Sequence, residues 1–387
     1  MSDIAILKSL LSKNEMIYPP ISIDSFSSKW NLMTSSTNGI IGNLLFLLTA
    51  GLMVARYLIK LPTISLESTF TINPAEAMYS AIKVFVLTLF HFKYNQRFFD
   101  EIITRFKAIN IDFDDQTRKY FWTRRAAYRI LMLLGYMPRV YYCIVIYKYS
   151  WPHQSSDQTP KLYSISARLN DDPLNYWTSL FASLLSIPLS LFHDLAFIDL
   201  AMLVQSALYY INNQVTAISK EMNIDGSKLD CKAVKTLRWQ YLLVHRLVDK
   251  SSSLTNLCTF GLISYYMTFF IFCFYTLAFD DHILPIKIST ILQTSGILIV
   301  LCLIIHAVVT IYTKSQESLP TLYKLSFETE SFQILNEISL FLYRIGFNDV
   351  GFSFGGIFMI TPDFISTLAA VTITVIIAIP SFVVPSS

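Results

Sequence analysis

Ionisable side chains inside apolar stretches are the residues whose chemistry is most restricted. An Asp, Lys or Arg at the centre of a membrane-spanning helix costs roughly 2.5–3.5 kcal/mol, so such a group needs a partner. The residues of this kind are Lys83, Arg139, Asp194, Asp199 and His306, together with His193, which directly precedes Asp194.

Two interpretations of these residues remain open. In the one that we favour, Asp194 or Asp199 pairs with Lys83 or Arg139 to fix helix packing, or Asp199 lies at the cytoplasmic edge of the membrane. In the other, the segment that holds His193 and Asp194 contains an internal polar functional site.

The sequence contains no motif that is typical of a catalytic or metal-binding site. It contains neither a phosphate-binding loop nor a nucleophile elbow, and its five cysteines form no CxxC, Cys/His or disulfide pattern. We therefore expect no enzyme activity, no metal and no cofactor. A net charge of +3 is also too small to indicate a nucleic-acid partner.

Composition indicates an integral membrane protein. Of 387 residues, 53% are hydrophobic and only 15% are charged. We predict an all-α fold with seven transmembrane helices. The expected spans are Gly39–Ile59, Ala77–Phe92, Ile130–Tyr147, Trp177–Val204, Leu254–Phe279, Ile286–Thr313 and Phe364–Val384.

Basic residues set the expected orientation. Lys and Arg concentrate in the N-terminal region and in the loops after the second, fourth and sixth segments. Because cytoplasmic loops carry the excess of positive residues, we expect an intracellular N-terminus and an extracellular C-terminus.

Two further segments have helical patterns without spanning character. The loop from Asn212 to Ser253 predicts a cytoplasmic helical layer. Tyr323–Ile345 predicts one amphipathic helix, which either lies on the membrane or packs against other subunits. Its expected apolar side consists of Phe332, Leu335, Ser339, Leu342 and Ile345.

The last segment carries a narrow face of small and weakly polar residues. This face suits close helix packing in lipid, which we consider first, or the wall of a wet pathway. Its members are Thr367, Ala370, Thr374, Ala378 and Ser381.

The end of the chain resembles the insect-type gustatory and odorant receptor superfamily, which includes gustatory-like receptors of nematodes. Gly356 stands at the family's glycine, and eighteen residues later Thr374 opens the terminal motif that ends at Phe382. Val375 and Ser381 replace the usual Tyr and Gln, so the chain would be a divergent member. The stretch Leu237–Tyr275 is also similar to the family.

The resemblance implies a chemosensory, ligand-gated, non-selective cation channel in the plasma membrane of sensory neurons. Its partners would be a small organic ligand, the lipid bilayer, and either identical subunits in a homotetramer or related subunits. On this basis we divide the chain into a cytoplasmic N-terminal region (1–38), a six-helix ligand-sensing bundle with cytoplasmic extensions (39–313), a cytoplasmic anchor-helix region (314–350), and a pore-lining seventh helix with a short extracellular tail (351–387).

The resemblance also implies the site residues. Val375, Ile379 and Phe382 would close the outer pore by dewetting, and Thr374, Ala378 and Ser381 would line it. A ligand pocket in the outer bundle would use aromatic and polar side chains, although tyrosines and tryptophans are also ordinary interfacial residues. The candidates are Tyr141, Tyr142, Trp177, Ser190, Tyr265, Tyr266 and Gln293.

Rival functions fit less well. A G-protein-coupled receptor also has seven spans, but it needs the opposite orientation, and its Asp/Glu-Arg-Tyr and Asn-Pro-x-x-Tyr motifs are absent. A transporter should show an internal repeat, and we find none. A light- or peroxide-sensing relative of the gustatory receptors remains an alternative.

Overall fold

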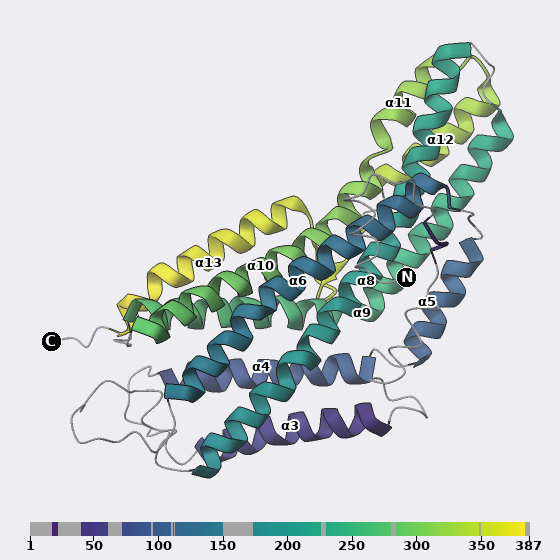
Figure 1. Cartoon of the computed structure of the whole chain (residues 1–387). Coiled ribbons are helices and arrows are strands. Elements are labelled where there is room, and N and C mark those ends of the chain that lie inside the picture. Colours follow the sequence, from purple (N-terminus) through teal and green to yellow (C-terminus); the bar gives the residue numbers. More distant parts are fainter. Residues whose placement is uncertain are drawn as a thin grey trace, which may run out of the picture.

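Long helices make up most of the part of the chain that the structure describes. The structure is a computed structural model that describes residues 18–21, 40–60, 72–93, 96–109, 111, 113–149, 173–225, 230–279, 284–347 and 350–383. Its helices are α3 (Ile40–Lys60), α4 (Ile72–Lys93), α5 (Gln96–Ile109), α6 (Asp115–Tyr149), α8 (Pro173–Asp225), α9 (Cys231–Phe279), α10 (Leu284–Gln316), α11 (Leu319–Glu328), α12 (Phe332–Phe347) and α13 (Pro362–Val383). Figure 1 shows α6, α8, α9 and α10 running together along the molecule.

Helix α8 lies at the centre of this bundle. It packs against α3, α6, α9 and α10, and every residue from Ala196 to Leu208 is buried. A helix that is apolar on all sides can bury all of them only when other helices surround it. With 53 residues, α8 is about 80 Å long, so it extends well beyond a hydrocarbon core of roughly 30 Å. The segment from Asn212 to Ser253 is helical in its described residues, as the sequence predicts, and its place on the cytoplasmic side stays a prediction.

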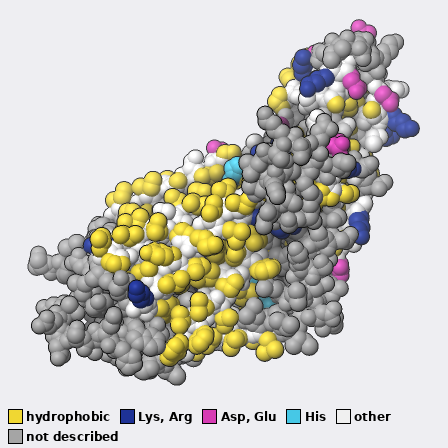
Figure 2. All heavy atoms as spheres, in the orientation of Figure 1, with side chains coloured by type: hydrophobic (Ala, Val, Ile, Leu, Met, Phe, Trp, Pro, Cys, Tyr) yellow, Lys and Arg dark blue, Asp and Glu magenta, His cyan; other side chains and the backbone are white. Residues whose placement is uncertain are grey.

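The surface of the bundle is suited to lipid. Within the described residues, the apolar stretches of four helices, α6, α8, α9 and α10, are long enough to cross a membrane. Shorter apolar stretches lie in α3, α4 and α13, where the sequence predicts the first, second and last spans. Apolar side chains cover the broad face in Figure 2, whereas charged ones gather at the end that holds α11 and α12. A multi-pass helical membrane protein is thus confirmed, and the count of seven spans and their orientation stay predictions.

The segment between α10 and α13 differs from the predicted single amphipathic helix. It forms two helices, because the backbone becomes extended at Thr329. The buried side of α12 consists of Ile334, Ile338, Phe341 and Ile345, whereas Phe332 is 82% exposed. This buried side packs on α9, where Arg238 Nε donates to Glu337 Oε2 at 2.8 Å.

A small hairpin joins α12 to α13 and is an addition to the expected all-α fold. Strand β1 (Ser353–Phe354) pairs antiparallel with β2 (Phe358–Met359). Gly355 and Gly356 have φ values of +66° and +77°, the left-handed conformation that a tight hairpin turn requires.

Candidate functional site

A buried polar cluster occupies the part of the bundle where α6, α8 and α9 meet. Tyr136 on α6 donates its hydroxyl to Asp194 Oδ2 at 2.5 Å, and Tyr266 on α9 donates to the same oxygen. The two tyrosine hydroxyls also lie 2.6 Å apart. We call Tyr136, Asp194 and Tyr266 the Asp194 cluster. Since Asp194 is only 1% exposed, these hydrogen bonds replace the water that burial removes.

Arg139 lies beside this cluster on α6. Its guanidinium donates to the Tyr265 hydroxyl and lies 5.2 Å from the centre of the Phe269 ring. It also interacts electrostatically with Asp194, which offsets the charge of each group in a medium of low polarity. Asp194 Oδ1 has no hydrogen-bond partner in the described part of the chain. The arrangement can therefore accept one further donor.

The predicted ligand-pocket residues divide into two groups. Tyr265, Tyr266, Ser190 and Gln293 are buried in the bundle, and the Oε1 atom of Gln293 has no partner among the described residues. Tyr141 and Trp177 instead face outward, with 46% and 44% of their surfaces exposed. Tyr142 is half-buried. The structure thus brings the two α9 tyrosines together with Asp194 and leaves Tyr141 and Trp177 at the bundle surface, where an interfacial role is the simpler interpretation.

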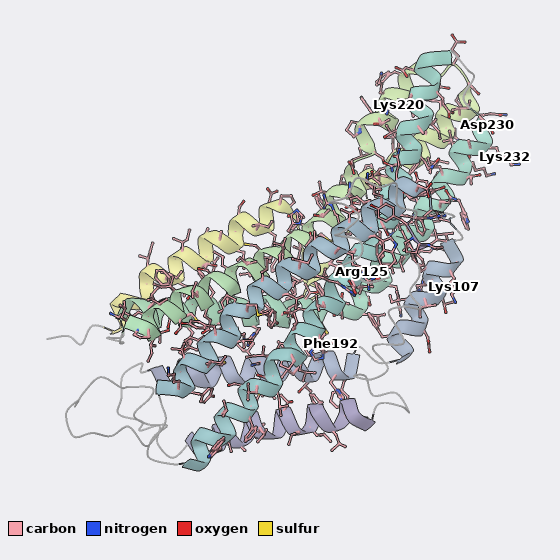
Figure 3. All side chains as sticks on the ribbon, in the orientation of Figure 1. Lys107, Arg125, Phe192, Lys220, Asp230 and Lys232 are labelled. Atoms are coloured by element: carbon pink, nitrogen blue, oxygen red, sulfur yellow. The ribbon has the colours of Figure 1, made fainter. Side chains whose placement is uncertain are left out.

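Of the pairings suggested by the sequence, Asp194 with Arg139 is present, whereas Asp199 pairs with two arginines that were not proposed for it. Arg125 donates through Nε and Nη2 to the two carboxylate oxygens of Asp199, both at 3.0 Å, and Arg129 binds the same carboxylate. Figure 3 shows Arg125 among the long helices. Both arginines lie on the part of α6 that precedes Ile130, the expected start of the third span. A long α6 brings them to α8.

The remaining intramembrane polar residues also contact neighbouring helices, although His193 Nδ1 has no hydrogen-bond partner among the described residues. Lys83 Nζ donates to Ser186 Oγ at 2.6 Å, which links α4 to α8. The His193 ring stacks on Phe90, with centroids 4.8 Å apart, and His306 shares a hydrogen bond with Tyr128. These contacts join neighbouring helices, so they have a structural role whether or not a ligand binds nearby.

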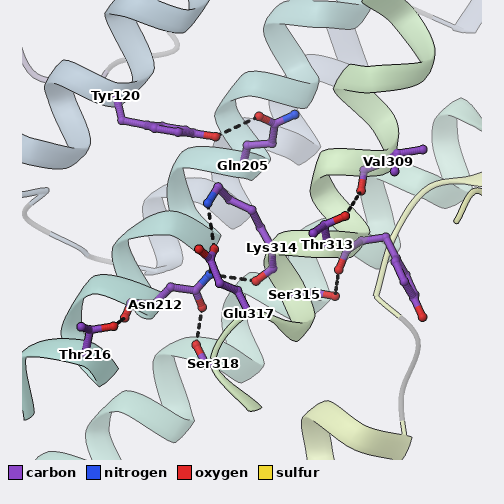
Figure 4. Close-up of polar contacts among 11 residues, drawn as sticks. Tyr120, Gln205, Asn212, Thr216, Val309, Thr313, Lys314, Ser315, Glu317 and Ser318 are labelled. Carbon is purple, nitrogen blue, oxygen red and sulfur yellow. Dashed lines mark hydrogen bonds and ion pairs between the residues drawn. The ribbon is translucent and has the colours of Figure 1, made fainter. Parts of the chain in front are cut away.

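A second group of polar side chains lies at the C-terminal end of α10, which the predicted orientation places on the cytoplasmic side. Asn212 Nδ2 donates to Lys314 O and to Glu317 Oε2, both at 2.8 Å, and Ser318 donates to Asn212 Oδ1 (Figure 4). Lys314 Nζ also bonds Glu317 Oε2 at 2.8 Å. These bonds hold the turn between α10 and α11 against α8. No motif in the sequence marks Asn212 for this role.

Helix α13 forms the predicted pore segment and lies on one side of the bundle (Figure 1). It packs on α9, and Phe364, Ile365 and Leu368 near its start contact the core. Thr374 and Val375 are exposed and Ala378 is half-buried. The side chains of Ile379, Ser381 and Phe382 lie outside the described residues.

Two solved structures share this arrangement of helices. The insect olfactory receptor OR5 from Machilis hrabei matches with a TM-score of 0.65 and 13% identity over 89% of each chain. OR5 in complex with eugenol matches with a TM-score of 0.65 and 14% identity over 90% of each chain. The chain has the fold of an insect olfactory receptor. The resemblance seen at the end of the sequence is thereby confirmed at the level of fold.

Sequence comparison alone finds no such similarity. No family model matches the chain, and no curated protein sequence matches it significantly. The identity to OR5 is low enough that only the fold follows from it.

Proposed function

We propose that the chain is a chemosensory receptor that acts as a ligand-gated, non-selective cation channel in the plasma membrane of sensory neurons. The observation that carries this proposal is α13, an apolar helix that stays largely exposed while α8 and α9 are packed from several sides. Thr367 and Thr374 place hydroxyl groups on its exposed surface, which suits the wall of a shared central pore. In this proposal the N-terminus is intracellular and the C-terminus extracellular.

In a tetramer, neighbouring subunits would cover surfaces that are exposed in the single chain. Exposed aromatic side chains line α11 and α12 at the charged end of the molecule, away from the apolar body (Figure 2). They are Tyr323, Phe327, Phe332, Tyr343 and Phe347. Aromatic side chains exposed at a charged, water-facing end are typical of a protein interface. We assign this surface to neighbouring subunits, identical or related.

In this tetramer the outer half of α13 would surround the axis. Val375, Ile379 and Phe382 would close the pore, because water columns between large apolar side chains are unstable. Thr374, Ala378 and Ser381 would line the open pore. With no acidic ring in this half of the helix, selection between small cations would be weak.

The ligand site in this proposal lies beside the Asp194 cluster. The aromatic rings of Tyr265 and Phe269 supply apolar surface, and Asp194 Oδ1 and Gln293 Oε1 supply acceptors. A small organic molecule with an aromatic or aliphatic body and a hydrogen-bond donor fits these groups. Eugenol, which is bound in one OR5 structure, is such a molecule and serves as the first probe.

The proposal predicts that the chain conducts without a G protein. Cells that express the chain alone should show a cation current in eugenol, or in a panel of small alcohols and phenols, with guanosine 5′-O-(2-thiodiphosphate) in the pipette. Thr374→Val should change single-channel conductance, because it removes a pore hydroxyl. Thr372→Val is the matched control, since Thr372 Oγ1 contacts Met267 Sδ on α9.

Three results would count against this function. A current that the nucleotide abolishes would indicate a G-protein-coupled receptor. If Thr374→Val and Thr372→Val changed the single-channel conductance equally, α13 would not line the pore. If the protein reaches the cell surface and no compound of the panel evokes a current, a channel that works without a partner subunit is contradicted.

A further inference from the structure

The hairpin before α13 contacts three helices of the bundle, α8, α9 and α10. On α9, Ser252 Oγ accepts a hydrogen bond from Ser353 N at 3.0 Å, and one turn later Asn256 O accepts from Gly355 N at 3.2 Å. On α10, Ser315 Oγ donates to Val350 O at 3.1 Å. On α8, the Phe197 ring meets the fully buried Phe352, with centroids 6.0 Å apart.

The glycines of the turn allow the hairpin to lie close to α9. A Cβ on Gly356 would lie 3.2 Å from Asn256 Nδ2, and one on Gly355 would contact the Phe260 ring. Both residues also have positive φ values, which residues with a Cβ rarely adopt. The Gly-Gly pair therefore fixes both the shape of the hairpin and its distance from α9.

A row of aromatic rings continues from α9 through the hairpin to α13. The Phe260 ring lies 4.9 Å from that of Phe354, and the Phe354 ring lies 5.2 Å from that of Phe364 in the first turn of α13. Aromatic rings at this spacing attract one another beyond the effect of their burial. The base of α13 is thus tied to α9 through Phe354.

Helix α9 also carries Tyr266, one of the two tyrosines of the Asp194 cluster. Ten residues separate Asn256 from Tyr266, which is about 15 Å along the helix axis. A packed helix moves as a unit over such a length, so a change at Tyr266 that tilts or shifts α9 also displaces Ser252 and Asn256.

We infer that the hairpin 350–361 is the coupling element through which movement of α9 reaches the base of α13, and that Ser252 is its positioning residue. This inference rests on the proposed function, because it assigns the gating movement of that channel to a particular contact. The contact of Thr372 with Met267, 3.8 Å from Oγ1 to Sδ, reports whether α13 is seated on α9.

The test measures this seating without ligand or current. Met267→Cys and Thr372→Cys are combined, and the rate of linkage by a short bifunctional methanethiosulfonate is followed in membranes. Each single cysteine variant controls for the native cysteines. Ser252→Ala removes the acceptor of Ser353 N, a hydrogen bond worth about 1 kcal/mol, so linkage should slow by roughly twofold to tenfold.

Two neighbouring substitutions make the result specific. Ser251→Ala should leave the rate unchanged, because Ser251 Oγ donates to Leu247 O within α9. Ser252→Thr retains a hydroxyl and should restore the rate. Absence of linkage in the parent pair, an unchanged rate in Ser252→Ala, or an equal loss in Ser251→Ala would each overturn the inference. The channel proposal is unaffected by these outcomes, since no step depends on conduction.

Discussion

Replacing Asp199 with asparagine is expected to destabilise the protein more than any other single charge substitution in the bundle. The carboxylate accepts hydrogen bonds from Nε and Nη2 of Arg125 and a third from Arg129, and it is 2% exposed. Breaking a buried pair by removing one partner costs about 3–5 kcal/mol, because the remaining charge stays buried. We expect a large loss of monodisperse protein and a strongly lowered melting temperature in detergent.

A matched pair of controls separates burial from charge. Asp115 also pairs with an arginine, Arg118, at 3.5 Å, but its side chain is 90% exposed, so Asp115→Asn should change stability by less than about 1 kcal/mol. Combining Asp199→Asn with Arg125→Gln should recover part of the loss. Equal melting temperatures for the two asparagine variants would show that the Asp199 pairing does not stabilise the fold.

The second large effect is expected at the contact of α6 with α10. A Cβ on Gly296 would lie 2.5 Å from the backbone oxygen of Gly135 and 3.2 Å from Pro138 Cγ. Backbone atoms cannot turn aside as a side chain can, so Gly296→Ala must separate the two helices. Overpacking of this kind typically costs about 1–3 kcal/mol, and thermal unfolding of purified protein measures it.

Gly346 provides the control for this prediction. It lies in α12, and a Cβ there would meet nothing within 4 Å. Alanine in a helix is favoured over glycine by roughly 0.5–1 kcal/mol, so Gly346→Ala should be neutral or stabilising. A Gly296→Ala protein as stable as the parent would mean that α6 and α10 do not approach this closely.

The helices were predictable from the sequence where one local pattern determines them. The last span was expected at Phe364–Val384, and α13 occupies Pro362–Val383. Long apolar runs without charge have few alternatives in a membrane, so their positions follow from length and hydropathy.

Pairing between helices was not predictable in the same way. The sequence suggested that Asp194 or Asp199 pairs with Lys83 or Arg139. Arg139 does interact with Asp194, but Asp199 pairs with Arg125 and Arg129 from the extension of α6. Which charge meets which depends on how α6 is shifted along α8, and a single sequence carries no record of that shift. The role of Asn212 was missed because a single polar residue on a helix belongs to no motif.

The amphipathic segment shows a further limit. Phe332 and Ile338 both belong to sets of apolar residues spaced by three or four, so the pattern alone fits either side of the helix. Packing on α9 selects Ile338, and Phe332 remains exposed. No Gly or Pro marks the break at Thr329, which is why one helix was expected instead of two.

The most direct test of the central claim is an electron cryomicroscopy structure of the purified chain in lipid nanodiscs. The account predicts a four-fold assembly with α13 around the axis and the exposed aromatic side chains of α11 and α12 buried between subunits. A monomer, or an oligomer in which α13 faces lipid at the periphery, would contradict the proposed channel.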